Sequence, residues 1–168
     1  IGMNAMNSFT MKCLTELGYD YIMPSPELTG VQLASIAEHS ALADRMLIGI
    51  HGRTPLMQLL HCPIKEHKGC QNCMGIAGAV TDEAGRVFPL VNIRYPDNCL
   101  VRMLNCRTTD LIDLFDRIPQ TAGYVLNFVG EQIDKVTERI AAANEAKNGK
   151  RQTQYPNSTR GHWVRKVE

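Results

Sequence analysis

A strand–helix–strand pattern sets the fold class of this chain, and it lies in residues 19–50, YDYIMPSPELTGVQLASIAEHSALADRMLIGI. Residues 19–23 and 46–50 are short apolar runs, which are typical of strands buried on both faces of a parallel sheet. Between them, Thr29 is a suitable N-cap for a helix over residues 31–38. Two strands joined by a helix predict a parallel βα unit.

Further strands and helices are predicted on both sides of this unit. The additional strands are expected at residues 1–7, 102–105 and 124–129, and the additional helices at residues 9–17, 108–115 and 131–143. In the last helix, Ile133, Val136 and Ile140 recur at helical spacing. About five parallel strands alternating with helices indicate an α/β fold, and we expect the C-terminal part of a TIM-like barrel over residues 1–144. Because its first strand would begin at residue 1, we expect the N-terminal half of the barrel to lie outside the chain.

Residues 51–99 do not follow this alternation and are expected to form an insertion. Within it, residues 77–80 and 86–91 flank Asp82-Glu-Ala-Gly85, which predicts a β-hairpin in which Gly85 supplies a positive φ. Because the insertion follows a strand, we expect it on the face of the barrel where ligands bind.

Residues 145–168 differ from the rest in composition. They carry six basic and two acidic residues, and we expect a linker followed by the start of a C-terminal domain that lies outside the chain. The whole chain has a formal net charge of only +1, so a general attraction to nucleic acid or membranes is not indicated. No apolar run approaches the ~20 residues of a membrane helix, and no secretory leader is visible, so we expect a cytoplasmic protein without a membrane partner.

Four cysteines of the insertion have a spacing that suits a metal centre. They are Cys62, Cys70, Cys73 and Cys99, in the pattern C-x7-C-x2-C-x25-C. Thiolates bind zinc or iron, and four of them complete a tetrahedral shell. A metal would also supply the free energy of ordering that a segment poor in apolar residues lacks. Reduced thiols without a metal are the alternative interpretation.

Other chemistries compete for the same cysteines. A thioredoxin-like role for Cys70 and Cys73 requires a strand before the pair and a helix at it, and the sequence predicts neither. Cys62 and the adjacent His61 are the residue types of a cysteine nucleophile and its base. A thiolate that ligates a metal cannot also attack a peptide bond, so the two roles of Cys62 exclude each other. His61 and His67 are further potential metal ligands.

Several motifs occur in a characteristic order along the chain. They are Ser25-Pro26-Glu27-Leu28-Thr29, His51-Gly52-Arg53-Thr54-Pro55-Leu56-Met57, His61-Cys62-Pro63, the C-x2-C pair, the hairpin with Phe88-Pro89, and Thr159-Arg160-Gly161-His162-Trp163. In this order the chain resembles the collagenase-like peptidase family, peptidase family U-32, over nearly its whole length. His51 stands where a tyrosine is common in that family.

The resemblance implies a fold, a cofactor and an activity. The chain would form the C-terminal half of a TIM-like barrel, and its four cysteines would hold an iron–sulfur cluster or another metal, zinc being the alternative. Members of the family are described as peptidases without a settled catalytic type. Others take part in hydroxylating tRNA, ribosomal RNA or a quinone precursor, so iron–sulfur-dependent RNA modification is the alternative function. The expected partner is accordingly a protein or peptide substrate, or RNA.

Two residues at strand ends are candidates for substrate binding. Glu27 follows the first strand of the unit and Arg53 follows the next, where barrel enzymes place acids, bases and ligand-binding groups. The alternative for Glu27 is a carboxylate that interacts favourably with the dipole at the N-terminus of a helix. The alternative for Arg53 is a structural ion pair. The sequence has neither a Gly-x-Ser-x-Gly elbow nor a His-Glu-x-x-His helix, so it indicates no catalytic residue.

The tail offers a separate hypothesis for RNA. Trp163, with Arg160 and Arg165 nearby, would stack on a base while the basic side chains contact phosphates. The alternative is a Trp163 that packs into the domain outside the chain. A third, non-enzymatic interpretation is a structural half whose partner supplies the chemistry.

Overall fold

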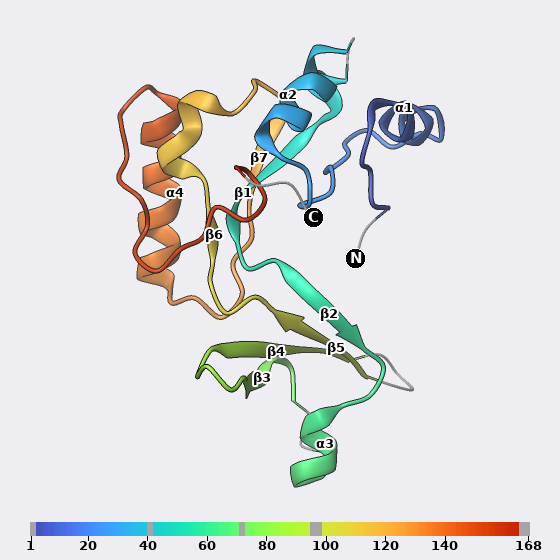
Figure 1. Cartoon of the computed structure of the whole chain (residues 1–168), viewed down its shortest axis with the longest axis vertical. Coiled ribbons are helices and arrows are strands. Elements are labelled where there is room, and N and C mark those ends of the chain that lie inside the picture. The colour runs from blue at the N-terminus through green and yellow to red at the C-terminus, as the bar shows by residue number, and fades with distance from the viewer. Residues whose placement is uncertain (1–2, 40–41, 71–72, 95–98, 165–168) are drawn as a thin grey trace.

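The chain forms two separate β-sheets, one covered by helices and one projecting from them (Figure 1). The computed structural model describes residues 3–39, 42–70, 73–94 and 99–164. Helices and parallel strands together confirm the α/β class. The TIM-like barrel stays a prediction, and the strand expected at residues 1–7 lies partly outside the described residues.

The first sheet has the strand order β6-β1-β7. Strand β1 (Leu47–Gly52) runs parallel to β7 (Gly123–Leu126) and antiparallel to the two-residue strand β6 (Thr109–Asp110). The strand predicted at residues 19–23 appears only as a parallel bridge between Ile22 and Met46. The sequence thus predicts the parallel pairing around β1, but the strands are shorter than expected.

Helices α1 (Ser8–Glu16) and α2 (Gly30–Glu38) follow the predicted spans closely. The N-cap Thr29 is confirmed, because its Oγ1 accepts from the Gln32 amide at 3.3 Å while Gln32 Oε1 accepts from the Thr29 amide at 2.9 Å. This reciprocal capping box satisfies two backbone donors that a helix start otherwise leaves unpaired.

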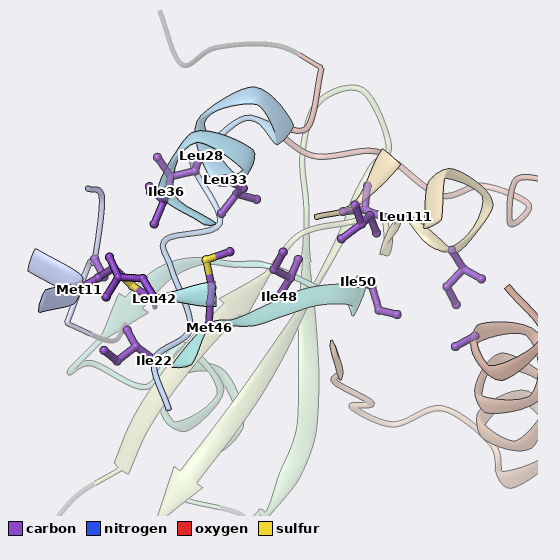
Figure 2. Packing of buried hydrophobic residues seen from close by; sticks show 14 of the residues in the cluster. Met11, Ile22, Leu28, Leu33, Ile36, Leu42, Met46, Ile48, Ile50 and Leu111 are labelled. Atoms are coloured by element: carbon purple, nitrogen blue, oxygen red, sulfur yellow. The ribbon is translucent and has the colours of Figure 1, made fainter. Parts of the chain in front are cut away.

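The core of the first sheet lies where these helices meet β1 (Figure 2). Met11, Met46 and Ile50 are almost completely buried, and the full burial of one such side chain contributes about 1.5–3 kcal/mol. Ile48 is buried as well, whereas Gly49 is exposed. The prediction that this strand is buried on both faces is therefore wrong over its first half.

The second sheet is antiparallel and has the order β2-β5-β4-β3. Its strands are β2 (Pro55–Leu59), β3 (Gly75–Thr81), β4 (Val87–Arg94) and β5 (Cys99–Leu104), and the short helix α3 (Pro63–Lys68) follows β2. The predicted hairpin is confirmed as β3 and β4, with Gly85 at φ +75°.

The strand predicted at residues 102–105 is wrong as a member of the parallel sheet. It belongs to β5, which pairs antiparallel with β2 and β4, so the insertion extends to Leu104 rather than to residue 99. The helix predicted at residues 108–115 is also wrong, because β6 opens this segment and a 3-10 helix (Ile112–Arg117) follows it.

Two connecting segments join the sheets at neighbouring points. The Asn105 amide donates to the Thr54 carbonyl at 2.9 Å, and the Thr54 and Thr109 hydroxyls lie 3.3 Å apart. The chain therefore leaves the parallel sheet and returns to it at almost the same place.

Helix α4 (Ile133–Lys147) presents an unexpected face to the protein. Ile133 and Ile140, whose spacing predicts the helix, are 74% and 45% exposed. The buried positions are instead Arg139, Ala143 and Ala146, at the i, i+4, i+7 spacing of one helix face. Arg139 faces inward because a buried carboxylate, that of Asp110, lies 3.8 Å from its Nε.

Helix α4 extends to Lys147, and residues 159–163 of the tail pack against the parallel sheet. The linker and the start of a further domain, expected over residues 145–168, stay predictions. Thr159 forms a parallel bridge with Thr109, and Arg160 makes two hydrogen bonds to the Asp113 carboxylate, at 2.9 and 2.7 Å. The Gly30 amide at the start of α2 donates to the Trp163 carbonyl at 3.0 Å. Across the described residues, no helix has the length and apolar character needed to cross a membrane.

Candidate active site

A cavity of about 390 Å³ lies at the carboxyl ends of the parallel strands. Its wall comes from the segment after Ile22, from β1 and the residues that follow it, from the end of β7, and from residues 160–163 of the tail. The volume is in the range of small-molecule and peptide side-chain sites, and the carboxyl ends of parallel strands are where α/β proteins bind ligands. Most of the lining is apolar, with Arg53, Arg160 and His51 among its polar members.

Gly52 shows how tightly the two strand ends approach each other at this cavity. Its φ is +141°, and a Cβ placed there would lie 2.6 Å from the carbonyl oxygen of Asn127. Only glycine fits both conditions, which explains the glycine of the His51-Gly52-Arg53 motif in physical terms. The Asn127 amide also donates to the His51 carbonyl at 2.8 Å, so this approach fixes the backbone of His51.

His51 and Asp110 form a buried pair beside the cavity. His51 Nδ1 lies 2.7 Å from Asp110 Oδ2, and the two side chains are 2% and 1% exposed. An ionised carboxylate only accepts hydrogen bonds, so Nδ1 carries the proton and Nε2 of the neutral ring keeps its lone pair. The other carboxylate oxygen, Oδ1, accepts from the Ile112 amide at 3.2 Å. The arrangement is that of an imidazole held in one tautomer by an acidic partner.

Arg139 and Tyr155 complete the surroundings of this pair. Arg139 Nε lies 3.8 Å from Asp110 Oδ2, and its guanidinium carbon lies 4.6 Å from the centre of the Tyr155 ring. The Tyr155 ring meets the His51 ring edge-on, with 5.8 Å between the ring centres. The centre of the Phe128 ring lies 5.1 Å from the centre of the His51 ring. Arg139 thus provides positive charge for a carboxylate that would otherwise be buried with only a neutral ring.

The structure places the two predicted substrate-binding residues differently. Arg53 lines the cavity, but its Nη1 donates to the carbonyls of Asn105 and Cys106 at 2.8 and 2.7 Å, so it holds the returning segment between the sheets. Glu27 is exposed and is not part of the cavity wall; its amide donates to Ser25 Oγ at 3.4 Å. Ser25, two residues before it, is buried and lines the cavity, as does Leu28 of the same motif.

The four predicted metal ligands are not brought together. Among the described residues, which include all four cysteines, no three His, Cys, Asp or Glu side chains form a group able to hold a metal ion. At Cys73, the Asn92 side-chain amide donates to both the carbonyl and Sγ, at 3.1 and 3.2 Å. The iron–sulfur cluster, with zinc as its alternative, therefore stays a prediction from the sequence that the described geometry does not support.

The alternative nucleophile pair is also not supported. His61 Nε2 lies 3.1 Å from Glu66 Oε2 on the exposed surface of the second sheet's helix, α3. This contact uses a ring nitrogen of His61 for Glu66 rather than for Cys62.

Searches against protein-family models, curated proteins and solved structures found no match for this chain. The resemblance to the U-32 peptidases therefore stays a prediction from the order of the sequence motifs.

The most strongly buried polar residues were missed from the sequence. Asp110 and Arg139 lie 59 and 88 positions after His51, and no local motif connects them. One signal was available, since His51 directly follows the apolar run of residues 46–50 and so continues a buried strand. A histidine in that position needs a hydrogen-bonding partner.

Proposed function

We propose that this chain belongs to a peptidase of the collagenase-like type and that hydrolysis takes place in the cavity at the carboxyl ends of β1 and β7. The order of the sequence motifs supports the family, and the position of the cavity supports the site. The observation that carries the proposal is the 2.7 Å contact between His51 Nδ1 and Asp110 Oδ2, buried beside the cavity. We place this activity in the cytoplasm, as the sequence suggests.

In the proposed reaction His51 acts as a general base and then as a general acid. Its Nε2 takes a proton from water as the water oxygen attacks the peptide carbonyl carbon. The imidazolium then returns a proton to the amide nitrogen as the C–N bond breaks, so the products are a carboxylic acid and an amine. Asp110 stabilises the imidazolium and keeps the ring in its tautomer. Such proton transfer contributes about 10²–10⁴-fold in rate.

The RNA-modifying alternative has less support from the described residues. The Arg160 guanidinium is engaged by both oxygens of Asp113, and the Trp163 ring packs over Gly30. Both side chains therefore already have partners within the chain. We assign no step to an iron–sulfur cluster, since the cysteines do not converge.

The test is a cleavage assay with collagen-like and unstructured peptides. We expect His51→Gln to lower kcat by about 10²-fold or more. His39→Gln is the matched control, because His39 is exposed at the end of α2 and, within the described part of the chain, its ring bonds only the Ser35 carbonyl. Full activity in His51→Gln, or wild-type protein that cleaves no peptide, would overturn the proposal.

A further inference from the structure

A second cleft, distinct from the cavity, is lined by three arginines. It has a volume of about 460 Å³ and lies between the turn of the β3–β4 hairpin, the segment that returns from β5, and tail residues 155–157. Its charged members are Arg53, Arg86, Arg107 and Glu131. The lining therefore carries an excess of positive charge in a chain whose net charge is only +1.

These guanidinium groups have unused donors. The exposed Arg107 side chain makes no hydrogen bond or ion pair with the described part of the chain. Arg86 uses Nε to bind Asp82 at 2.6 Å, and Arg53 uses Nη1 for two backbone carbonyls. Each guanidinium has five donors in a planar fork, so all three retain N–H groups for an anion.

The one acidic member of the cleft is held by its own loop. A Glu131 carboxylate oxygen accepts from the backbone amide of Val129, two residues before it. This contact holds the Glu131 carboxylate in its own loop, and the three arginines still leave the lining with an excess of positive charge over this one acidic residue.

The cleft adjoins the proposed active site through two residues. Arg53 lines both the cavity and the cleft. Tyr155 lines the cleft, and its ring meets the edge of His51, which lines the cavity. A chain that occupies the cavity can therefore reach the arginines in the next few residues.

We propose that this cleft binds carboxylate side chains of an acidic peptide segment next to the bond that is cleaved. The inference rests on the proposed function, because it names the substrate class of that site. Arginine forks suit carboxylates and phosphates alike, but RNA recognition also needs aromatic faces for stacking. The cleft's aromatic residue, Tyr155, is covered by Arg139 and His51, and Trp163 is covered at Gly30, so a peptide is the better fit.

The test measures binding without turnover. Fluorescence anisotropy is recorded with two labelled peptides that are identical except that one has three glutamates where the other has three glutamines. We expect the acidic peptide to bind about five- to tenfold more tightly at low salt, and the difference to shrink at high salt. Arg107→Gln should remove most of the difference. Arg117→Gln, an exposed arginine outside the cleft, is the matched control and should keep it.

Two outcomes would overturn the inference. One is equal affinity for both peptides in the wild-type protein. The other is a single-stranded RNA oligomer that binds more tightly than the acidic peptide in an Arg107-dependent manner, which would assign the cleft to phosphodiesters. Because binding is measured directly, an acidic preference in a protein that cleaves nothing would reject the hydrolytic proposal alone and leave the cleft's assignment intact.

Discussion

Around the parallel sheet, charged and polar side chains are buried and lie close to one another, whereas in the antiparallel sheet the cysteines are half-buried or exposed and form no metal-binding group among the described residues. His51 and Asp110 are almost fully buried at 2.7 Å from each other, beside Arg139. In the second sheet, Cys62, Cys73 and Cys99 are half-buried and belong to no metal-binding group among the described residues. Apolar residues such as Met57 and Val87 are about half exposed there.

The difference follows from what covers each sheet. Helices α1, α2 and α4 and the tail enclose the parallel sheet (Figure 1), and the burial they create makes every polar group there dependent on a partner. The antiparallel sheet projects from this body; it buries a few side chains such as Leu90 and Val101, but its cysteines and several of its apolar residues are half-buried or exposed. Substitutions should therefore have large effects in the first sheet and small ones in the second.

The largest effect is expected at Asp110. Asp110→Ala removes the acidic partner of both His51 and Arg139 and leaves a buried guanidinium without compensation, so the free energy of unfolding should fall by about 3–5 kcal/mol. Urea denaturation followed by circular dichroism measures it. Asp116→Asn, an exposed carboxylate in the neighbouring 3-10 helix, is the control and should change stability by less than about 0.5 kcal/mol. If Asp110→Ala lowered the free energy of unfolding by less than about 1 kcal/mol, the expected difference in sensitivity between the two sheets would be contradicted.

A smaller loss is expected at Gly30. A Cβ at this position would lie 2.6 Å from the Trp163 ring, so Gly30→Ala should displace the tail and cost about 1–3 kcal/mol. Trp163 is the only tryptophan of the chain, so a red shift of its fluorescence reports the displacement. Ser35→Ala, on the exposed face of α2, should leave the emission unchanged. Unchanged emission in Gly30→Ala would mean that the tail contributes no wall to the cavity.

Cys73→Ser tests the second sheet. Its effect on stability should stay within about 1 kcal/mol, because a hydroxyl can still accept from the Asn92 amide. Iron, zinc and acid-labile sulfide are measured on protein purified anaerobically, and from the described geometry we expect less than one metal per chain in wild type and variant alike. Stoichiometric metal that disappears in Cys73→Ser would show that the cysteines converge, and would restore the metal centre predicted from the sequence.

The smallest effect is expected at the hairpin turn. The Arg86 backbone amide, which donates to Asp82 Oδ1 at 2.9 Å, lowers the pKa of Asp82, and the Arg86 side chain acts in the same direction. Because these contacts favour the ionised carboxylate, they stabilise the folded state. The stabilisation is present above the ordinary aspartate pKa of about 3.9 and is lost as the pH falls through the lower pKa that Asp82 has in the folded protein. Chemical shifts of the Ala84 and Arg86 amides should follow this titration. In Asp82→Asn they should not, and identical titrations in both proteins would contradict the expectation.

Local rules predicted the features that depend on neighbouring residues. Thr29 caps α2, and Gly85 closes the hairpin, because a cap and a tight turn are determined within four residues. Long-range pairing was not predictable in this way. The apolar character of residues 102–105 suits a parallel or an antiparallel strand equally, and its partners, β2 and β4, are set by the fold of the whole insertion.

The candidate site was predictable only in outline. Strand ends near Arg53 were expected to carry the site, and the cavity does lie there. The inward face of α4 could not be inferred, since the spacing of Ile133 and Ile140 favours a different face of the helix. Asp110, in a distant segment, gives Arg139 a reason to be buried. A charged residue on a helix face can thus report a buried partner that periodicity does not reveal.

The neighbouring crossings between the sheets, where the Asn105 amide binds the Thr54 carbonyl, have a consequence for ancestry. A segment whose two ends meet at one hydrogen bond can be gained or deleted in a single genetic event, with a short turn closing the gap. Residues 55–104 are thus a module that recombination could exchange between proteins while the registers of β1 with β6 and β7 stay as they are.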